Sequence, residues 1–150
     1  MAWIHQLALR STSAAAAGLI LGMLMLPLDD ARGQPVELLR IRAANWEDRV
    51  RVVLDLSAQT TYRERALRGP HRIAIDLSQT TAPSLRPPQV DDWMVTRIRF
   101  NQLRGPTAQV VLDLSREPSF DVFMLPAYEN KPFRVVCDVF RPLRGEPGRK

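Results

Sequence analysis

Cysteine and histidine are scarce in this 150-residue chain, which has one cysteine and two histidines. Zinc sites draw mainly on these two residue types, so the sequence predicts no metal site. His5 lies in an N-terminal segment that we expect to be removed, and His71 lies in a predicted turn. The single Cys137 cannot form an intramolecular disulfide, and it alternates with valines. We therefore expect it to be a small buried hydrophobic residue and not a nucleophile.

Catalytic motifs are also missing. No glycine-rich phosphate loop follows a predicted strand, and no Gly-x-Ser-x-Gly elbow presents a serine nucleophile. Four aspartates could suggest a carboxylate pair for glycoside cleavage. Each of them follows a strand-like segment beside an arginine, however, which favours structural ion pairs. We expect no catalytic residue, no cofactor and no enzymatic activity.

Composition indicates one ordinary globular domain, with 45% hydrophobic and 25% charged residues. The formal net charge is +5. The first 33 residues carry two arginines and two aspartates, so 19 cations and 14 anions remain without them. A mild basic surplus suits anionic partners such as wall polymers, phospholipid or nucleic acid, and does not choose among them.

Residues 1–33 have the three-part layout of a secretory signal. An apolar stretch covers 13–28, and Ala31 and Gly33 supply small residues where a signal peptidase reads the chain. The predicted mature chain begins at Gln34, and export through the Sec pathway predicts a periplasmic protein. An uncleaved membrane anchor is the alternative, although the stretch is shorter than the roughly 20 residues of a bilayer span. Neither a twin-arginine pair nor a cysteine near the cleavage point is present, which disfavours the Tat route and a lipoprotein anchor.

An internal repeat is the most informative feature, with units at about 36–78 and 93–140. The segment Val-Val-Leu-Asp-Leu-Ser occurs at 52–57 and again at 110–115. In both units an Ile-Arg segment precedes it, and two further β-branched or aromatic segments follow in the same order. Short segments of this kind, bounded by turn formers, predict strands. We predict an all-β fold: a two-layer β-sandwich of two repeated, roughly four-stranded units.

Alternation within these strands separates an apolar side from a polar side. One unit alone would expose its apolar side to water, so we expect the apolar side of one unit to pack against that of the other. The predicted core residues are Leu39, Ile41, Val50, Val52, Leu54, Leu56, Ile73, Ile75, Leu77, Ile98, Phe100, Val110, Leu112, Leu114, Val135, Cys137 and Val139.

The polar sides carry arginine and aspartate at matching positions of the two units. They are either solvated faces with weak cross-strand ion pairs or binding platforms, since guanidinium groups suit carboxylates and sugar hydroxyls. Their repetition in both units favours platforms. Trp46 and Trp93, near strand ends, could stack on sugar rings or plug the sandwich. The candidate ligand-binding residues are Arg40, Arg42, Arg51, Asp55, Arg72, Asp76, Arg97, Arg99, Gln109, Asp113, Arg134 and Asp138.

Two segments are expected to lie outside the repeat units. Residues 79–92 join the units, and their prolines should keep this connection extended. Residues 143–150 form a predicted flexible tail rich in proline, glycine and basic residues. The predicted folded domain is therefore 34–142.

The segments Val95–Gln102 and Val110–Ser115, with shorter counterparts at 41–42 and 72–77, resemble the AMIN domain of exported bacterial wall proteins. The resemblance spans about 36–140. It implies a symmetric β-sandwich that binds peptidoglycan and localises a wall-remodelling or secretion system. The family usually has arginine where this chain has Gln109, so we expect the two outer faces to differ.

Family members typically precede the zinc catalytic part of N-acetylmuramoyl-L-alanine amidases or occur in pilus secretins. These 150 residues contain no such zinc domain, so a non-catalytic targeting domain is expected. The expected partners are peptidoglycan and envelope proteins such as an amidase, pilus or secretin component. The alternative function is a protein-interaction module of a pilus or secretin assembly, which adds contacts through a sheet edge. Nucleic acid conflicts with export, and a membrane is a partner only if the signal segment is retained.

Overall fold

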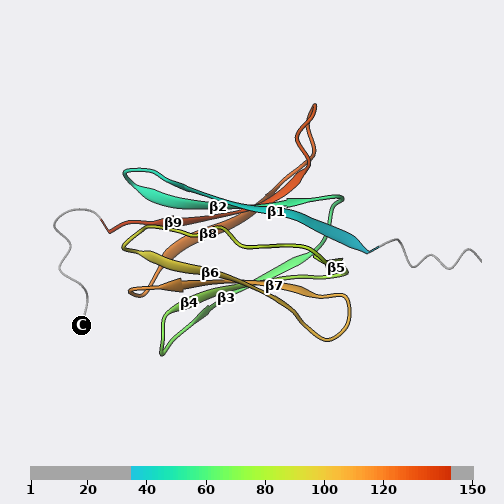
Figure 1. The fold of residues 1–150 in the computed structure, drawn as a ribbon. Coiled ribbons are helices and arrows are strands. Elements are labelled where there is room, and N and C mark those ends of the chain that lie inside the picture. The colour runs from blue at the N-terminus through green and yellow to red at the C-terminus, as the bar shows by residue number, and fades with distance from the viewer. Residues whose placement is uncertain (1–34, 143–150) are drawn as a thin grey trace, which may run out of the picture. The chain divides into compact units, whose positions relative to one another are not determined.

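The computed structural model of the protein describes residues 35–142, and this part of the chain contains nine strands and no helix. The strands form two sheets, which Figure 1 shows as two layers. The predicted all-β, two-layer sandwich is confirmed. In chain order the strands are β1 (Val36–Asn45), β2 (Arg49–Leu56), β3 (Tyr62–Leu67), β4 (Arg72–Leu77), β5 (Thr80–Thr81), β6 (Val95–Gln102), β7 (Ala108–Leu114), β8 (Ser119–Leu125) and β9 (Phe133–Phe140).

The predicted signal peptide, its cleavage point and the predicted tail lie outside the described residues. Within 35–142, no helix is long and apolar enough to cross a membrane.

The central strands form because apolar and polar residues alternate along them. In β2, the side chains of Val50, Val52 and Leu54 are fully buried, whereas those of Arg49 and Arg51 are partly exposed. A period of two is that of a strand with one side on the core and the other toward solvent. The strand β7 repeats the pattern.

Each sheet takes strands from both repeat units. The first sheet has the order β5-β1-β2-β9-β8, and the second has the order β3-β4-β7-β6. The strands β2 and β9 pair antiparallel, and so do β4 and β7. The expectation that the two units pack face to face as separate layers is therefore wrong. Alternation identifies the apolar side of a strand, but it does not say which strands become neighbours.

Equivalent strands of the two units occupy equivalent places. The order β1-β2-β9-β8 in the first sheet corresponds to β6-β7-β4-β3 in the second. Both β1 and β6 also have a register shift, between Leu38 and Arg40 and between Val95 and Arg97. Such an irregularity turns two consecutive residues toward one side. The predicted core position Leu39 is consequently wrong: Leu39 is 48% exposed, and Leu38 is 2% exposed and lies in the core.

The core lies between the two sheets. The other predicted core residues are all buried there, except for Phe100, which is partly buried and packs against the core. Cys137 belongs to this cluster, and burial raises the pKa of its thiol. This confirms Cys137 as a small buried hydrophobic residue.

The connection between the units lies near the outermost strands of both sheets. Thr80–Thr81 form β5, which pairs parallel with the start of β1. Further along, Asn45 Nδ2 of β1 donates a hydrogen bond of 3.3 Å to the carbonyl of Asp91. Residues 87–90 lie beside β6, and together with Thr96–Asn101 they line a groove of about 690 Å³, here called the β6 groove.

The pairing of β2 with β9 and of β4 with β7 predicts that neither unit folds alone. We expect residues 34–91 and 92–142, produced as separate fragments, to give NMR spectra with poorly dispersed amide signals. Mixing the fragments should restore the dispersion that the 34–142 fragment shows, because each supplies the missing central strands of the other. A well-dispersed spectrum from one isolated fragment would contradict this pairing.

Candidate functional site: the two outer faces

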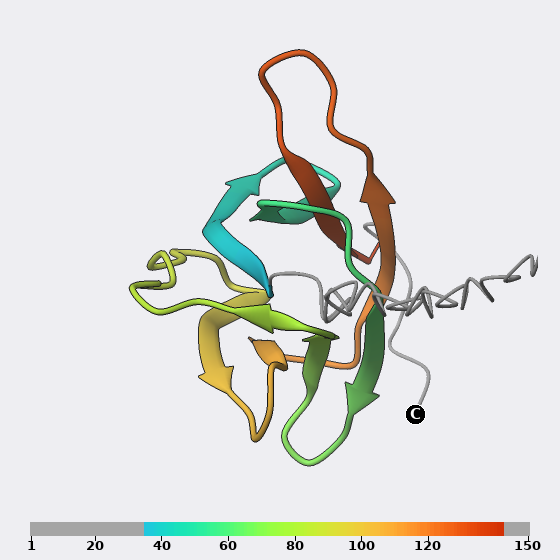
Figure 2. The same cartoon turned by 90° about the vertical axis from the view of Figure 1, so that its right-hand side faces the viewer.

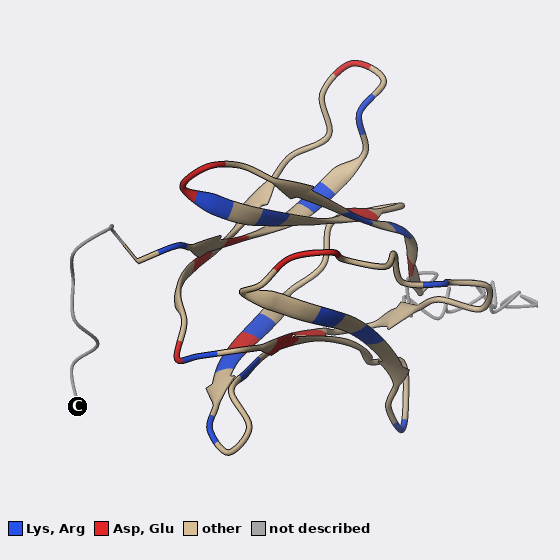
Figure 3. Cartoon of the chain, turned by 60° about the vertical axis from the view of Figure 1, so that its left-hand side comes forward, with Lys and Arg blue, Asp and Glu red and all other residues tan. Residues whose placement is uncertain are grey.

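The outer sides of the sheets form two polar faces. We call the outer side of β1, β2, β9 and β8 the first face, and that of β3, β4, β7 and β6 the second face. Figure 3 shows basic and acidic residues along the strands of both layers. The first face carries Arg40, Arg42, Arg51, Asp55, Arg134 and Asp138, and the second carries Arg72, Asp76, Arg97, Arg99, Gln109 and Asp113.

On the first face, two aspartates each bind arginine through two hydrogen bonds. Arg42 donates from Nε and Nη2 to Asp55 at 2.8 and 2.7 Å, and Arg40 Nε adds a longer contact of 3.3 Å. Arg51 donates from Nε and Nη2 to Asp138 at 2.6 and 2.7 Å. The second pair joins strands of different repeat units.

The second face repeats one of these pairs and alters the other. Arg99 donates to Asp113 at 2.8 and 2.6 Å, in the place of Arg42 and Asp55. Gln109 Nε2, in the place of Arg51, donates one hydrogen bond of 2.7 Å to Asp76. Asp76 also accepts a hydrogen bond of 2.7 Å from Arg65. At Gln109 the two faces therefore differ as expected. A hydrogen bond from a neutral amide on the second face replaces the bidentate ion pair of the first face.

Burial distinguishes the aspartates of the two faces. The side chains of Asp55 and Asp138 are each 3% exposed, against 20% for Asp76 and 25% for Asp113. Hydrogen bonding by Arg51 holds the pKa of Asp138 below its usual value, against the effect of burial. The aspartates of the first face are thus covered by other atoms, and a ligand can reach only their arginine partners.

Three of the predicted site arginines make no ion pair with any residue of 35–142: Arg72, Arg97 and Arg134. Arg72 and Arg134 occupy equivalent positions of β4 and β9. In both, Nε is buried and has no hydrogen-bond partner within the described part of the chain. The three unpaired arginines each stand opposite an aspartate in the register and do not bind it. The paired Arg42 and Arg99, in contrast, stand opposite valines and bind an aspartate one row away, which the sequence could not show.

Trp46 and Trp93 are 46% and 53% exposed, so neither plugs the sandwich. The guanidinium carbons of Arg51 and Arg49 lie 4.7 and 5.3 Å from the Trp46 ring centre. Those of Arg116 and Arg141 lie 5.5 and 5.6 Å from the Trp93 ring centre. Stacked arginines orient both indoles at the surface.

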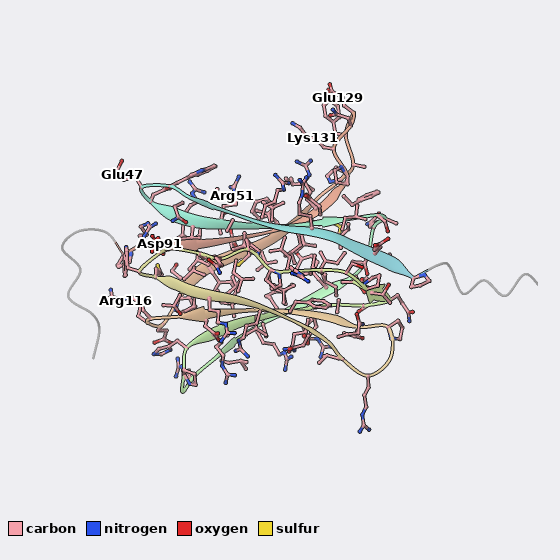
Figure 4. All side chains as sticks on the ribbon, viewed as in Figure 1. Glu47, Arg51, Asp91, Arg116, Glu129 and Lys131 are labelled. Carbon is pink, nitrogen blue, oxygen red and sulfur yellow. The ribbon has the colours of Figure 1, made fainter. Side chains whose placement is uncertain are left out.

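Arg141 is a structural residue that the sequence pattern did not single out. Its Nη2 donates to Asp92 at 2.7 Å and its Nε to the Trp46 carbonyl at 3.1 Å. Burial opposes ionisation of Asp92, but Arg141 and two backbone N–H groups lower its pKa overall. The two hydrogen bonds of Arg141 connect the end of β9 to the β1–β2 turn and to the start of β6. Figure 4 places Glu47 of that turn at the same end of the sandwich as Asp91 and Arg116.

A groove of about 600 Å³ opens on the first face beside Trp46, and we call it the indole groove. Apolar side chains from the middle of the sheet and guanidinium groups both line it, a combination suited to a ligand with apolar and polar sides. Its lining includes Trp46, Arg42, Arg51, Val53, Leu125, Arg134 and Val136.

Metal ligands do not gather in the described part of the chain. Residues 35–142 contain no group of three or more His, Cys, Asp or Glu side chains that could hold a metal ion. His71 is partly buried in the turn before β4, and its Nδ1 has no partner among these residues.

A β-sandwich with two arginine-bearing faces and surface grooves has the features of a ligand-binding domain. More specifically, the chain belongs to the AMIN domain family, whose model matches residues 32–137. Domains of this family are non-catalytic and occur in exported envelope proteins, where they bind peptidoglycan and target amidases and secretins. No curated protein matches the sequence.

Replacing Asp138 tests whether the covered carboxylates hold the first face together. Asp138→Asn should lower the free energy of unfolding at pH 7 by about 2 kcal/mol. The reason is that Arg51 and also Arg49, whose Nη1 donates to Asp138 at 3.1 Å, lose a charged acceptor. The folded-state pKa of Asp138 is lowered, so its stabilising effect is present above about pH 4 and is lost as the pH falls below that. Urea titrations should therefore show a smaller loss of stability between pH 5 and pH 2 in Asp138→Asn than in the wild type.

Asp121 supplies the matched control. It is exposed, stands opposite Asp138 in the β8–β9 register and makes no ion pair within 35–142. Asp121→Asn should change the free energy of unfolding by less than about 0.5 kcal/mol. Equal effects of the two substitutions would show that the ion pairs of Asp138 add nothing to stability.

Proposed function

We propose that this protein is a non-catalytic peptidoglycan-binding domain that localises a wall-remodelling or secretion system in the periplasm. Its membership in the AMIN domain family supports this role. The observation that carries the proposal is the construction of the outer faces. Both present guanidinium groups at solvent-facing positions, and aspartates beneath or beside them hold several of these groups in place.

Peptidoglycan offers the groups that such faces bind. Its stem peptides carry carboxylates, which accept paired hydrogen bonds from a guanidinium group. Its sugars carry hydroxyls and apolar ring faces, and exposed indoles such as Trp46 and Trp93 stack on apolar ring faces. Ion pairing already orders Arg42, Arg51 and Arg99, so binding by these three costs less side-chain entropy than it would for free side chains.

The second candidate is a protein-interaction module, and the sheet edges favour it. The strands β3, β6 and β8 each stand at the end of a sheet, so one backbone edge of each has no strand partner. The β8–β9 hairpin also extends beyond the sandwich in Figure 2, and Figure 4 places Glu129 and Lys131 near its tip. Tyr128 of this hairpin is 65% exposed. A partner protein could add a strand or cover the tyrosine.

Sedimentation with purified peptidoglycan sacculi separates the two functions. We expect the protein to pellet with sacculi at low and moderate salt, to pellet less at high salt because charged contacts are screened, and to return to the supernatant after muramidase digestion. Recovery entirely in the supernatant at low salt would contradict wall binding. A pull-down that recovers one envelope protein and survives wall digestion would favour the interaction module.

A further inference from the structure

The two outer faces can be compared position by position, because equivalent strands occupy equivalent places. One row of the second face reads Leu67, Arg72, Asp113, Arg97 across β3, β4, β7 and β6. The equivalent row of the first face reads Leu125, Arg134, Asp55, Arg40 across β8, β9, β2 and β1. These rows have the same charges.

The neighbouring rows differ in charge. The outermost strand β3 contributes Arg65 and Arg63 to the second face, where β8 contributes Phe123 and Asp121 to the first. Over the twelve matched positions, the second face has five arginines and two aspartates, whereas the first has four arginines and three aspartates. The second face is therefore the more cationic, at +3 against +1.

The excess charge of the second face is not neutralised internally. Its two aspartates bind Arg99 and Arg65, which leaves Arg63, Arg72 and Arg97 without an ion pair among residues 35–142. Arg72 and Arg97 both stand opposite Asp113 in the register, one on each side. Because Asp113 already binds Arg99 through two hydrogen bonds, these two guanidinium groups flank a carboxylate that is engaged elsewhere.

The β6 groove borders this cationic face. Arg97 and Arg99 line the groove together with residues 87–90. The strand β6 ends the second sheet, so its outer backbone edge has no strand partner. An extended peptide can bind along such an edge through main-chain hydrogen bonds, and the neighbouring arginines would then receive its carboxylates.

We infer that the second face binds the stem peptide of peptidoglycan through its carboxylates, with Arg72 and Arg97 as the main charged contacts and the β6 groove for the peptide backbone. This inference rests on the proposed function and names the component of the wall that is bound. Unpaired guanidinium groups attract a peptide that carries several carboxylates, whereas they give neutral sugars no net electrostatic attraction. The first face, with its nearly balanced charge and covered aspartates, contributes less to this contact.

The central experiment compares equivalent arginine pairs on the two faces in sacculus sedimentation. Arg72→Gln/Arg97→Gln should weaken binding by about tenfold or more, because two charge-assisted contacts are lost. The equivalent Arg134→Gln/Arg40→Gln variant should weaken it by no more than about threefold. Arg68→Gln/Arg104→Gln, in the exposed β3–β4 and β6–β7 turns, removes the same charge and should bind like the wild type. An equal or larger loss from the first-face variant would overturn the inference.

Two measurements distinguish lost binding from lost folding in these variants. Amide NMR spectra must show that each variant is folded, and Arg97→Gln alone, at an exposed position, should still weaken binding if Arg72→Gln/Arg97→Gln does not fold. If the wild type itself fails to pellet, the proposed function fails. If the wild type pellets and the two face variants lose the same amount of binding, the proposed function stands and the assignment to the second face is wrong.

Soluble probes identify the bound component by NMR titration of the wild type. A disaccharide-tetrapeptide should shift amide signals of β4 and β6, whereas a neutral N-acetylglucosamine oligomer should leave them unchanged. A disaccharide whose only carboxylate is the lactyl group should shift them less than the tetrapeptide form. Equal shifts with the neutral oligomer, or binding to phosphatidylglycerol vesicles that exceeds binding to sacculi, would overturn the assignment to stem-peptide carboxylates.

Discussion

The structure depends on the antiparallel pairing of β2 with β9 and of β4 with β7. These pairings join the two repeat units inside each sheet, and they place the four most buried strands in the interior of the sheets. Each central strand buries one side in the shared core, so the core exists only when strands of both units are in place. The domain is thus one cooperative unit although its sequence is a duplication.

The same pairings also create the outer faces. Asp138 of β9 meets Arg51 of β2, and Asp76 of β4 meets Gln109 of β7, so both contacts cross from one repeat unit to the other. Buried carboxylates without partners would be costly, and bidentate arginines satisfy those of the first face. On the second face, Gln109 is a weaker partner, and the edge strand β3 adds arginines. The duplication therefore supplies two similar platforms, and a few substitutions give them different charge.

Much of this could be predicted from particular segments. The repeated Val-Val-Leu-Asp-Leu-Ser segments have a period of two, which predicts strands with an apolar side, and all twelve candidate residues lie on the outer faces. The prediction failed at Leu39, because alternation counted back from Ile41 assigns Leu39 to the core, whereas the register shift in β1 gives that place to Leu38. The sequence also could not predict which arginines form ion pairs, since Arg72 and Arg99 have similar sequence surroundings.

The sequence by itself determined that the chain is a duplicated all-β domain with apolar sides to bury and arginine-bearing sides to expose, because side-chain alternation is a local property of a strand. Only the tertiary structure decided which strands are neighbours, and therefore which aspartate each arginine reaches and where uncompensated positive charge remains. Those contacts join residues up to 89 positions apart, as between Arg49 and Asp138. Packing of the whole domain selects them, and no local pattern encodes them.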